Sequence, residues 1–305
     1  MCGLFGYTCY GNVPKNILKL TQSLAEEAAV RGTDATGIAY VKSGKVKIFK
    51  QAKAASDMKF NHSDNVRAIM GHTRHSTQGS EKRNFNNHPF LGKCKDTNFA
   101  FAHNGVLMND SILKMRYNFP KTHIETDSYV GVQLLEYKKK LNAESLKFMA
   151  EEVEGSFSFS ILDDKNNMYL VKGDSPLSIL HFPELRMYIY ASTDEILYKG
   201  IVDSPLFDEL MCKRYEKIPI EEGQILKITS SGLLEYSRFN YTYSYGMRWW
   251  DYGFGFSDKK EENEYIRDLK SVAAYQGYEP ETVDELLGSG FCLEEIEDYI
   301  YGMEL

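Results

Sequence analysis

The sequence predicts an α+β domain, in which strands that follow one another in long runs are covered by a few helices. Of the 305 residues, 43% are hydrophobic and 26% are charged, which is the range of globular proteins that bury a sizeable core. Segments of strand character do not alternate regularly with helices, and this favours α+β layers over βαβ units. No internal repeat is visible.

The N-terminal half begins on a strand. Residues 2–9 are short, apolar and punctuated by glycine, which is typical of a buried strand. A helix is expected over 14–30, because apolar residues recur on one helical face until Arg31-Gly32 ends the pattern. Further strands are expected at 36–41, 46–49, 66–71 and 98–102, the first two joined by a hairpin turn at Ser43-Gly44. Helices are expected at 126–140 and 143–153.

The second half is predicted to be rich in strands. They are expected at 156–162, 168–171, 177–180, 187–191, 224–228 and 233–236. The composition shifts near Tyr241, and residues 241–256 contain both tryptophans. Two helical patterns follow, near 280–287 and 293–301. We therefore predict a main domain over 2–240, an aromatic-rich linker over 241–256 and a small helical tail over 257–305.

Charge and cysteine usage restrict the class of protein. The formal charge of −7 argues against a general electrostatic attraction to nucleic acid or to anionic lipid. The five cysteines include no CxxC pair, which is typical of a reduced chain rather than of a disulfide framework. Neither a long apolar run nor a signal peptide is recognisable. The sequence thus predicts a cytoplasmic protein with no nucleic-acid or membrane partner.

Cys2 is the most informative residue. If Met1 is removed, the thiol and a free α-amine lie on the same residue. An α-amine has a pKa of about 7.7–8.0 and can act as a general base at neutral pH, directly or through one water. The thiol is intrinsically nucleophilic. The alternative interpretation is a small apolar residue that opens a strand.

Several short motifs strengthen the catalytic interpretation. They are Cys2-Gly3-Leu4-Phe5-Gly6, Arg31-Gly32-Thr33-Asp34-Ala35-Thr36-Gly37, Gly71-His72-Thr73-Arg74-His75-Ser76-Thr77-Gln78-Gly79, Asn87-His88-Pro89, Ala102-His103-Asn104-Gly105 and Glu125-Thr126-Asp127. In this order and spacing, residues 2–230 resemble the class II glutamine amidotransferase domain of the N-terminal-nucleophile hydrolases. The glutaminase domain of glucosamine-6-phosphate synthase is the most similar type. The resemblance implies a four-layer αββα sandwich with a small C-terminal helical appendage.

The resemblance also assigns catalytic roles. Cys2 would attack the side-chain amide of L-glutamine, release ammonia and leave a γ-glutamyl thioester that water hydrolyses. Asn104 and Gly105 would form the oxyanion hole, in which a side-chain amide and a backbone N–H stabilise the developing negative charge. The alternative for Gly105 is a turn glycine.

Substrate-binding roles follow from the same resemblance. Arg74 would bind the α-carboxylate of glutamine and Asp127 its α-ammonium, so that a free amino acid is selected. Thr77 would support the substrate, and Arg31-Gly32 would form a loop near the nucleophile. The alternatives are a surface arginine for Arg74, a helix N-cap for Asp127 and a helix C-terminal cation for Arg31.

Two positions depart from the family pattern. His75 stands where an aromatic residue is usual, and Gln78 where histidine is common, which leaves the finer substrate contacts open. An alternative role as metal ligands exists for four histidines: His72, His75, His88 and His103. Their spacing fits no standard zinc signature, and the resemblance implies neither a metal nor another cofactor.

The acceptor of the ammonia is not apparent in the sequence. Only about 65 residues follow Tyr241, too few for a synthase domain, so a separate acceptor protein is expected. The aromatic run 241–256 could dock such a partner, stack single-stranded bases, or pack on its own domain; base stacking is disfavoured because Arg248 is its single basic residue. Two other functions stay open: a glutamine-sensing or scaffold subunit without turnover, and another N-terminal-nucleophile amide hydrolase.

Overall fold

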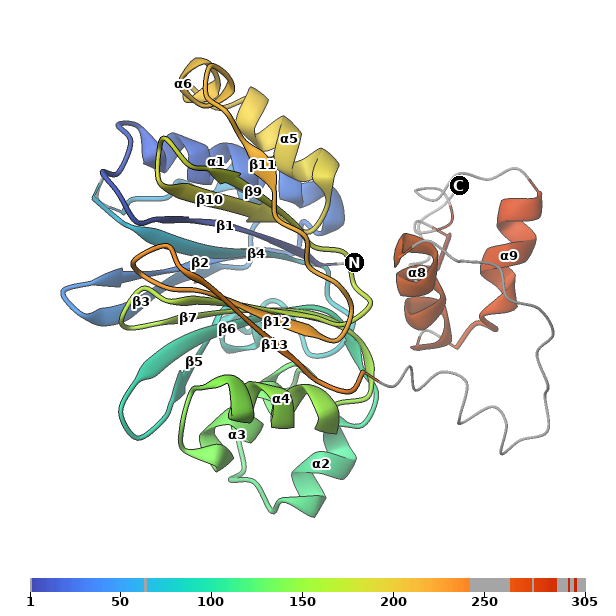
Figure 1. Cartoon of the computed structure of the whole chain (residues 1–305). Coiled ribbons are helices and arrows are strands. Elements are labelled where there is room, and N and C mark those ends of the chain that lie inside the picture. Colours follow the sequence, from blue (N-terminus) through green and yellow to red (C-terminus); the bar gives the residue numbers. More distant parts are fainter. Residues whose placement is uncertain are drawn as a thin grey trace.

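Two antiparallel sheets form the centre of the molecule (Figure 1). The computed structural model describes residues 2–62, 65–241, 264–275, 277–289, 296 and 299–300. The seven-stranded sheet has the order β11-β9-β10-β1-β4-β2-β3, and the six-stranded sheet the order β13-β12-β8-β7-β6-β5. The strands of the first are β1 (Gly3–Cys9), β2 (Ala35–Lys42), β3 (Lys45–Gln51), β4 (Ala68–Arg74), β9 (Ser178–Phe182), β10 (Met187–Ala191) and β11 (Glu216–Lys217). Those of the second are β5 (Phe90–Lys93), β6 (Asn98–Leu107), β7 (Gly155–Asp163), β8 (Met168–Lys172), β12 (Gln224–Ile228) and β13 (Leu234–Arg238).

Helices cover the outer face of each sheet. The first sheet is covered by α1 (Ile17–Ala28), α5 (Asp194–Val202) and α6 (Phe207–Met211), and the second by α2 (Asp110–Arg116), α3 (Tyr129–Lys138) and α4 (Ala143–Glu152) (Figure 1). Three short 3-10 segments lie at Ala29–Arg31, Ala55–Asp57 and Asn84–Asn86. Separate apolar clusters fill the space under each helical layer and the space between the sheets. The predicted four-layer αββα sandwich is therefore confirmed.

The alternation of side chains along the strands directs the site residues inward. In β1, Phe5 packs under the helices while Leu4 belongs to the cluster between the sheets. In β6, Ala100 and Ala102 belong to that same middle cluster. Because successive side chains point to opposite faces of a strand, even-numbered positions near the ends of β1 and β6 also face the middle layer.

Most predicted elements are present, and the differences have identifiable causes. Strand β6 extends five residues beyond the predicted end at residue 102, because β7 pairs with its polar end from His103 to Leu107. The helices α2, α5 and α6 and the strands β5 and β11 were not predicted. The sequence feature that marks the start of α5 is its N-cap residue, Thr193, whose side chain accepts a hydrogen bond from the backbone N–H of Ile196.

The described part of the C-terminal region contains α8 (Glu264–Tyr275) and α9 (Glu281–Gly288). Its apolar side chains cluster around Val106 of β6, which is 2% exposed, and α8 contacts β6 and β7. The members besides Val106 are Leu269, Val272, Ala273, Val283, Ile296 and Ile300. Helix α8 was not predicted, whereas α9 was.

Parts of the predicted tail lie outside the described residues. They include residues 242–256 of the aromatic run and most of the expected helix 293–301. Tyr241, the first residue of the run, packs its ring 5.4 Å from that of Phe157, and its hydroxyl lies 3.5 Å from the carbonyl oxygen of Gly155. This one residue of the run thus packs on its own domain, and the predicted domain boundaries stay predictions.

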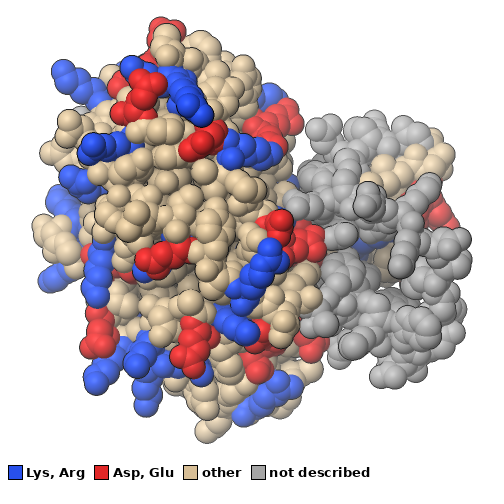
Figure 2. All heavy atoms as spheres, viewed as in Figure 1, with Lys and Arg blue, Asp and Glu red and all other residues tan. Residues whose placement is uncertain are grey.

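Acidic and basic side chains are interspersed on the face of the molecule seen in Figure 2. No helix among the described residues is both long enough and apolar enough to span a bilayer. Within the same residues, Cys2, Cys9, Cys94 and Cys212 carry free thiols.

Candidate active site

Cys2 lies directly before β1, at one end of the central strand of the first sheet. It is two residues before Leu4, so in the alternation of the strand its side chain faces the layer between the sheets, as that of Leu4 does. The thiol donates to the carbonyl oxygen of His75, with Sγ 3.5 Å away. Burial raises the pKa of the Cys2 thiol, although positive charge nearby, including that of Arg74, acts in the opposite direction. The thiol is therefore protonated at neutral pH, and a nucleophilic role for its sulfur would require a base.

Arg31 connects Cys2 to the opposite sheet. It ends the 3-10 turn that follows α1 and is 4% exposed. Its Nε donates to the main-chain oxygen of Cys2 at 2.8 Å, and its Nη2 donates to Oδ1 of Asn104 at 3.4 Å. The guanidinium thus holds a residue from each sheet, in addition to lying at a helix C-terminus.

Asn104 presents an unused donor beside this contact. Its side chain is fully buried, and its Nδ2 has no hydrogen-bond partner among the described residues. A buried donor without a partner costs about 1–3 kcal/mol, so an arrangement that retains one needs a reason. The oxygen of the same amide is occupied by Arg31, so the NH₂ group is the part available to a ligand.

Gly105 follows within β6 and not in a turn. Its φ is +128°, a conformation that favours glycine. A Cβ added there would lie 2.1 Å from the carbonyl oxygen of Ser156 on the neighbouring strand β7. The interpretation as a plain turn glycine is therefore wrong, and the backbone at this position is shaped by a close approach between strands.

The loop after β4 passes close to Gly32. A Cβ at Gly32 would lie 2.4 Å from the carbonyl carbon of Arg74 and 2.5 Å from the backbone nitrogen of His75. Asp34 fixes the same loop from two sides: its Oδ2 accepts from the N–H of Ser76 at 2.7 Å, and its own N–H donates to the oxygen of Arg74 at 3.0 Å. Gly32 and Asp34 therefore set where the loop lies over Cys2.

Arg74 is a buried residue and not a surface arginine, at 3% exposure. Its Nη1 donates to Oδ1 of Asn87 at 2.6 Å, and its Nη2 donates to the carbonyl oxygens of Gln78 and Gly79, both at 2.7 Å. These contacts use three of the five N–H donors of a guanidinium. Thr77 is half-buried in the loop that Arg74 holds.

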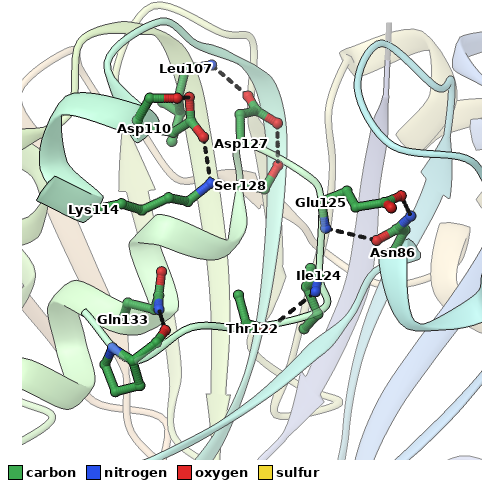
Figure 3. Close-up of polar contacts among 12 residues, drawn as sticks. Asn86, Leu107, Asp110, Lys114, Thr122, Ile124, Glu125, Asp127, Ser128 and Gln133 are labelled. Carbon is green, nitrogen blue, oxygen red and sulfur yellow. Dashed lines mark hydrogen bonds and ion pairs between the residues drawn. The ribbon is translucent and has the colours of Figure 1, made fainter. Parts of the chain in front are cut away.

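Asp127 approaches from the second sheet. Its Oδ2 accepts from the backbone N–H of Leu107 at 2.6 Å, and its Oδ1 accepts from the hydroxyl of Ser128 at 3.2 Å (Figure 3). The carboxylate is thus turned toward the end of β6. The alternative role as an N-cap is wrong, since Ser128 occupies the N-cap position of α3.

The segment before Asp127 is held by a reciprocal pair. The N–H of Glu125 donates to Oδ1 of Asn86 at 2.9 Å, and Nδ2 of Asn86 donates to Oε2 of Glu125 at 2.8 Å (Figure 3). Arg83 adds an ion pair to the same carboxylate. This side of the site is therefore fixed to the 3-10 turn at residues 84–86.

Three of the histidines considered as ligands are buried beneath the site. The rings of His72 and His88 lie 4.1 Å apart, and Nε2 of His72 contacts the carbonyl oxygen of His103 at 2.9 Å. Burial lowers the pKa of His72 to about 3, that of His88 well below its usual value, and that of His103 as well. Across the described residues, no group of three or more His, Cys, Asp or Glu side chains could hold a metal ion. His75 contributes its carbonyl oxygen near Cys2.

Sequence reasoning did not assign three residues that support the site. Asp34 and Asn87 lie inside the recognised motifs, and their place there was the available signal. Lys50 carries no such signal; it donates to the carbonyl oxygens of Asn87 and Pro89, the latter at 3.0 Å. Burial, with a contribution from Arg74, lowers the pKa of Lys50 to about 8.

Part of the chain matches a protein family, and curated relatives are similar to it in sequence. Residues 1–134 match the family of class II glutamine amidotransferases. The chain is 31% identical over 187 residues to the glutamine–fructose-6-phosphate aminotransferase (isomerizing) of Geobacillus kaustophilus, an alignment that covers 59% of this chain and 30% of that protein. It is 27% identical over 247 residues to the 7-cyano-7-deazaguanine synthase of Saccharolobus solfataricus, covering 77% of this chain and 50% of that protein.

A solved structure shows the same fold. The glutamine phosphoribosylpyrophosphate amidotransferase from B. subtilis superimposes with a TM-score of 0.59 at 23% identity, over 78% of this chain and 49% of that one. The chain therefore spans half or less of the length of each of these three proteins. From these comparisons, we conclude that residues 1–134 match the class II glutamine amidotransferases and that the chain shares the fold of a solved amidotransferase.

Proposed function

We propose that this domain hydrolyses the side-chain amide of free L-glutamine, with Cys2 as the nucleophile. The observation that carries the proposal is the buried, unpartnered Nδ2 of Asn104, next to an arginine that also binds the main chain of Cys2. A donor held in this way is suited to an oxyanion that forms during the reaction, because it is oriented before charge develops.

The reaction needs a base, because burial keeps the Cys2 thiol protonated. Removal of Met1 gives an α-amine that can accept the thiol proton, directly or through one water. The sulfur then attacks the amide carbon, and the oxyanion meets Nδ2 of Asn104 and the N–H of Gly105. The C–N bond breaks, ammonia leaves with the proton from the amine, and a γ-glutamyl thioester remains. Water hydrolyses the thioester to glutamate and restores the thiol.

Recognition of a free amino acid would come from the two ends of the site. Arg74 retains two of its five N–H donors for the α-carboxylate, because one of the other three donates to Asn87 and two donate to the loop. Asp127 would accept from the α-ammonium. Thr77, on the loop that Arg74 holds, would support the bound substrate.

The ammonia would pass to an acceptor enzyme on another chain. The relatives differ in what their names say of the acceptor: one is a fructose-6-phosphate aminotransferase and another a 7-cyano-7-deazaguanine synthase. For this chain, the packing of the C-terminal helices on Val106 places them next to Gly105, so that an acceptor could meet the site beside them.

An intact-mass measurement with a diazoketone analogue of glutamine tests the proposal. We expect the native protein to lack Met1 and to gain one adduct, located on Cys2 and prevented by excess glutamine. A Cys212→Ser variant, which removes the exposed thiol, should gain the same adduct. Retention of Met1, or an adduct that forms equally in a Cys2→Ala variant, would overturn the mechanism.

A further inference from the structure

A buried chain of polar side chains leads from β7 to the carboxylate of Asp127. Nε2 of His103 lies 3.2 Å from the carbonyl oxygen of Ser156, and its Nδ1 lies 2.9 Å from Oγ of Ser128. The Ser128 hydroxyl lies in turn 3.2 Å from Oδ1 of Asp127. The exposed fractions of His103, Ser128 and Asp127 are 1%, 4% and 4%, so water does not compete for these contacts.

The imidazole of His103 is fixed in orientation. The single hydroxyl proton of Ser128 is donated to the carboxylate of Asp127, so Nδ1 of His103 carries the ring proton and donates to Oγ of Ser128. The ring also packs against Phe159, with 5.0 Å between ring centroids. The contact with Phe159 and the hydrogen bond from Nδ1 hold the ring in one orientation, with Nδ1 directed toward Ser128.

Ser128 transmits this orientation to Asp127. It lies one residue after Asp127 at the start of α3, and its hydroxyl stands between the imidazole and the carboxylate. The other carboxylate oxygen is held by the backbone N–H of Leu107 at 2.6 Å (Figure 3). Both oxygens of Asp127 are thus held, while an ionised carboxylate still has lone pairs to offer a ligand.

We propose that His103 is a positioning residue, which acts through Ser128 to hold Asp127 in the orientation that accepts the α-ammonium of glutamine. This inference rests on the function proposed above. It makes His103 and Ser128 determinants of selectivity for a free amino acid, although neither would touch the substrate.

His88 provides the contrast that separates positioning from core packing. It is as buried as Ser128 and Asp127, at 4% exposure, and stacks on His72. Neither of its ring nitrogens has a hydrogen-bond partner among the described residues. A histidine in this core can therefore serve by packing alone, whereas His103 has both nitrogens within hydrogen-bonding distance of oxygen atoms.

The test compares glutamine with glutaramate, which is glutamine without its α-ammonium. Ammonia release gives kcat and KM for each substrate, and the ratio of the two kcat/KM values measures recognition of the ammonium. We expect His103→Phe and Ser128→Ala each to lower this ratio by about tenfold, through the KM of glutamine, since each removes one hydrogen bond next to a charged group. The ratio should be retained in Ser128→Thr, which keeps the hydroxyl, and in the packing control His88→Phe.

A double variant tests whether His103 acts through Ser128. We expect His103→Phe to cause no further loss of the ratio in the Ser128→Ala background, because the link is already broken. An additive loss, or an unchanged ratio in both single variants, would overturn the inference. Failure of the proposed function gives a different result: the wild-type protein, with Met1 removed, would release no ammonia from glutamine.

Discussion

Arg31 donates to the side-chain oxygen of Asn104 and leaves the amide nitrogen of that residue buried without a partner. The same guanidinium donates to the main chain of Cys2. A fork-shaped donor can make both contacts at once, which a lysine ammonium does with less directional control. The relation between these residues determines which end of the Asn104 amide faces the space next to Cys2.

Asn104→Asp should lower kcat about 10²–10³-fold, as the loss of one oxyanion-hole donor does in other acyl-transfer enzymes. The substitution preserves shape but replaces the NH₂ group by an oxygen, so it repels the oxyanion and changes KM little. Steady-state ammonia release from glutamine measures both constants. Asn12→Asp, an exposed substitution of the same kind, serves as the control. A fall of less than tenfold in kcat would contradict the assigned role.

Gly105→Ala should destabilise the fold far more than Gly44→Ala. Both glycines have a positive φ, at +128° and +66°, but a Cβ at Gly44 meets nothing within 4 Å, whereas one at Gly105 meets the oxygen of Ser156 at 2.1 Å. The Gly44 change should cost about 1–2 kcal/mol from backbone strain alone. The Gly105 change should cost at least about 4 kcal/mol, the range of severe packing defects. If urea unfolding gave the same loss in the free energy of unfolding for both variants, β6 and β7 would be able to separate at this point.

Acid should destabilise the protein through the buried histidines. The pKa of His72 is lowered to about 3 in the folded state, and that of His88 is lowered well below its usual value, because burial disfavours the charged ring. The unfolded chain binds protons at these residues below a pH of about 6.5, so stability is full above that value and is lost as the pH falls toward the folded pKa. For His72, this should lower the free energy of unfolding by about 2 kcal/mol at pH 5, and His88 should add a loss in the same direction. In urea titrations between pH 7 and 5, the free energy of unfolding should fall less in His88→Phe than in the wild type. The difference in slope against pH should correspond to about one proton.

Val106→Ala should loosen the C-terminal helices without unfolding the sandwich. Val106 contacts residues of that region in a shared apolar cluster, so shortening it removes about 2 kcal/mol of packing there. Hydrogen exchange should become faster in α8 and remain unchanged in α1. Val30→Ala, at a position that is 71% exposed, should leave hydrogen exchange unchanged in both helices. Unchanged exchange in α8 would mean that Val106 does not hold these helices.

The sequence allowed the sandwich and the neighbourhood of Cys2 to be predicted, because both are encoded locally. Strand periodicity and turn residues indicate the elements one at a time, and the motifs around Arg31, Arg74 and Asn104 are contiguous. For Gly105, local reasoning also offered a turn glycine as the alternative interpretation, because Asn-Gly is a common turn pair. That alternative is wrong. The positive φ inside a strand follows from pairing with β7, which no local pattern reveals.

Contacts between distant segments could not be predicted in this way. The link from His103 to Asp127 depends on the register of β6 with β7 and on the start of α3, which the sequence placed at residue 126 and the structure places at Tyr129. The packing of the C-terminal helices on Val106 joins residues more than 150 positions apart, and their sequence shows only amphipathic patterns.

The groups around Cys2 come from both sheets, and the two sheets are joined face to face mainly through apolar contacts at their centre, with polar contacts such as that between Nε2 of His72 and the carbonyl oxygen of His103. Apolar contacts have no preferred direction, so they resist separation of the sheets better than they resist sliding. A slide of one sheet along the other would move Asn104 relative to Cys2 without breaking a single strand pairing. The rate of the chemical step should therefore respond to changes in the outer helical layers that shift one sheet, even where they lie far from Cys2.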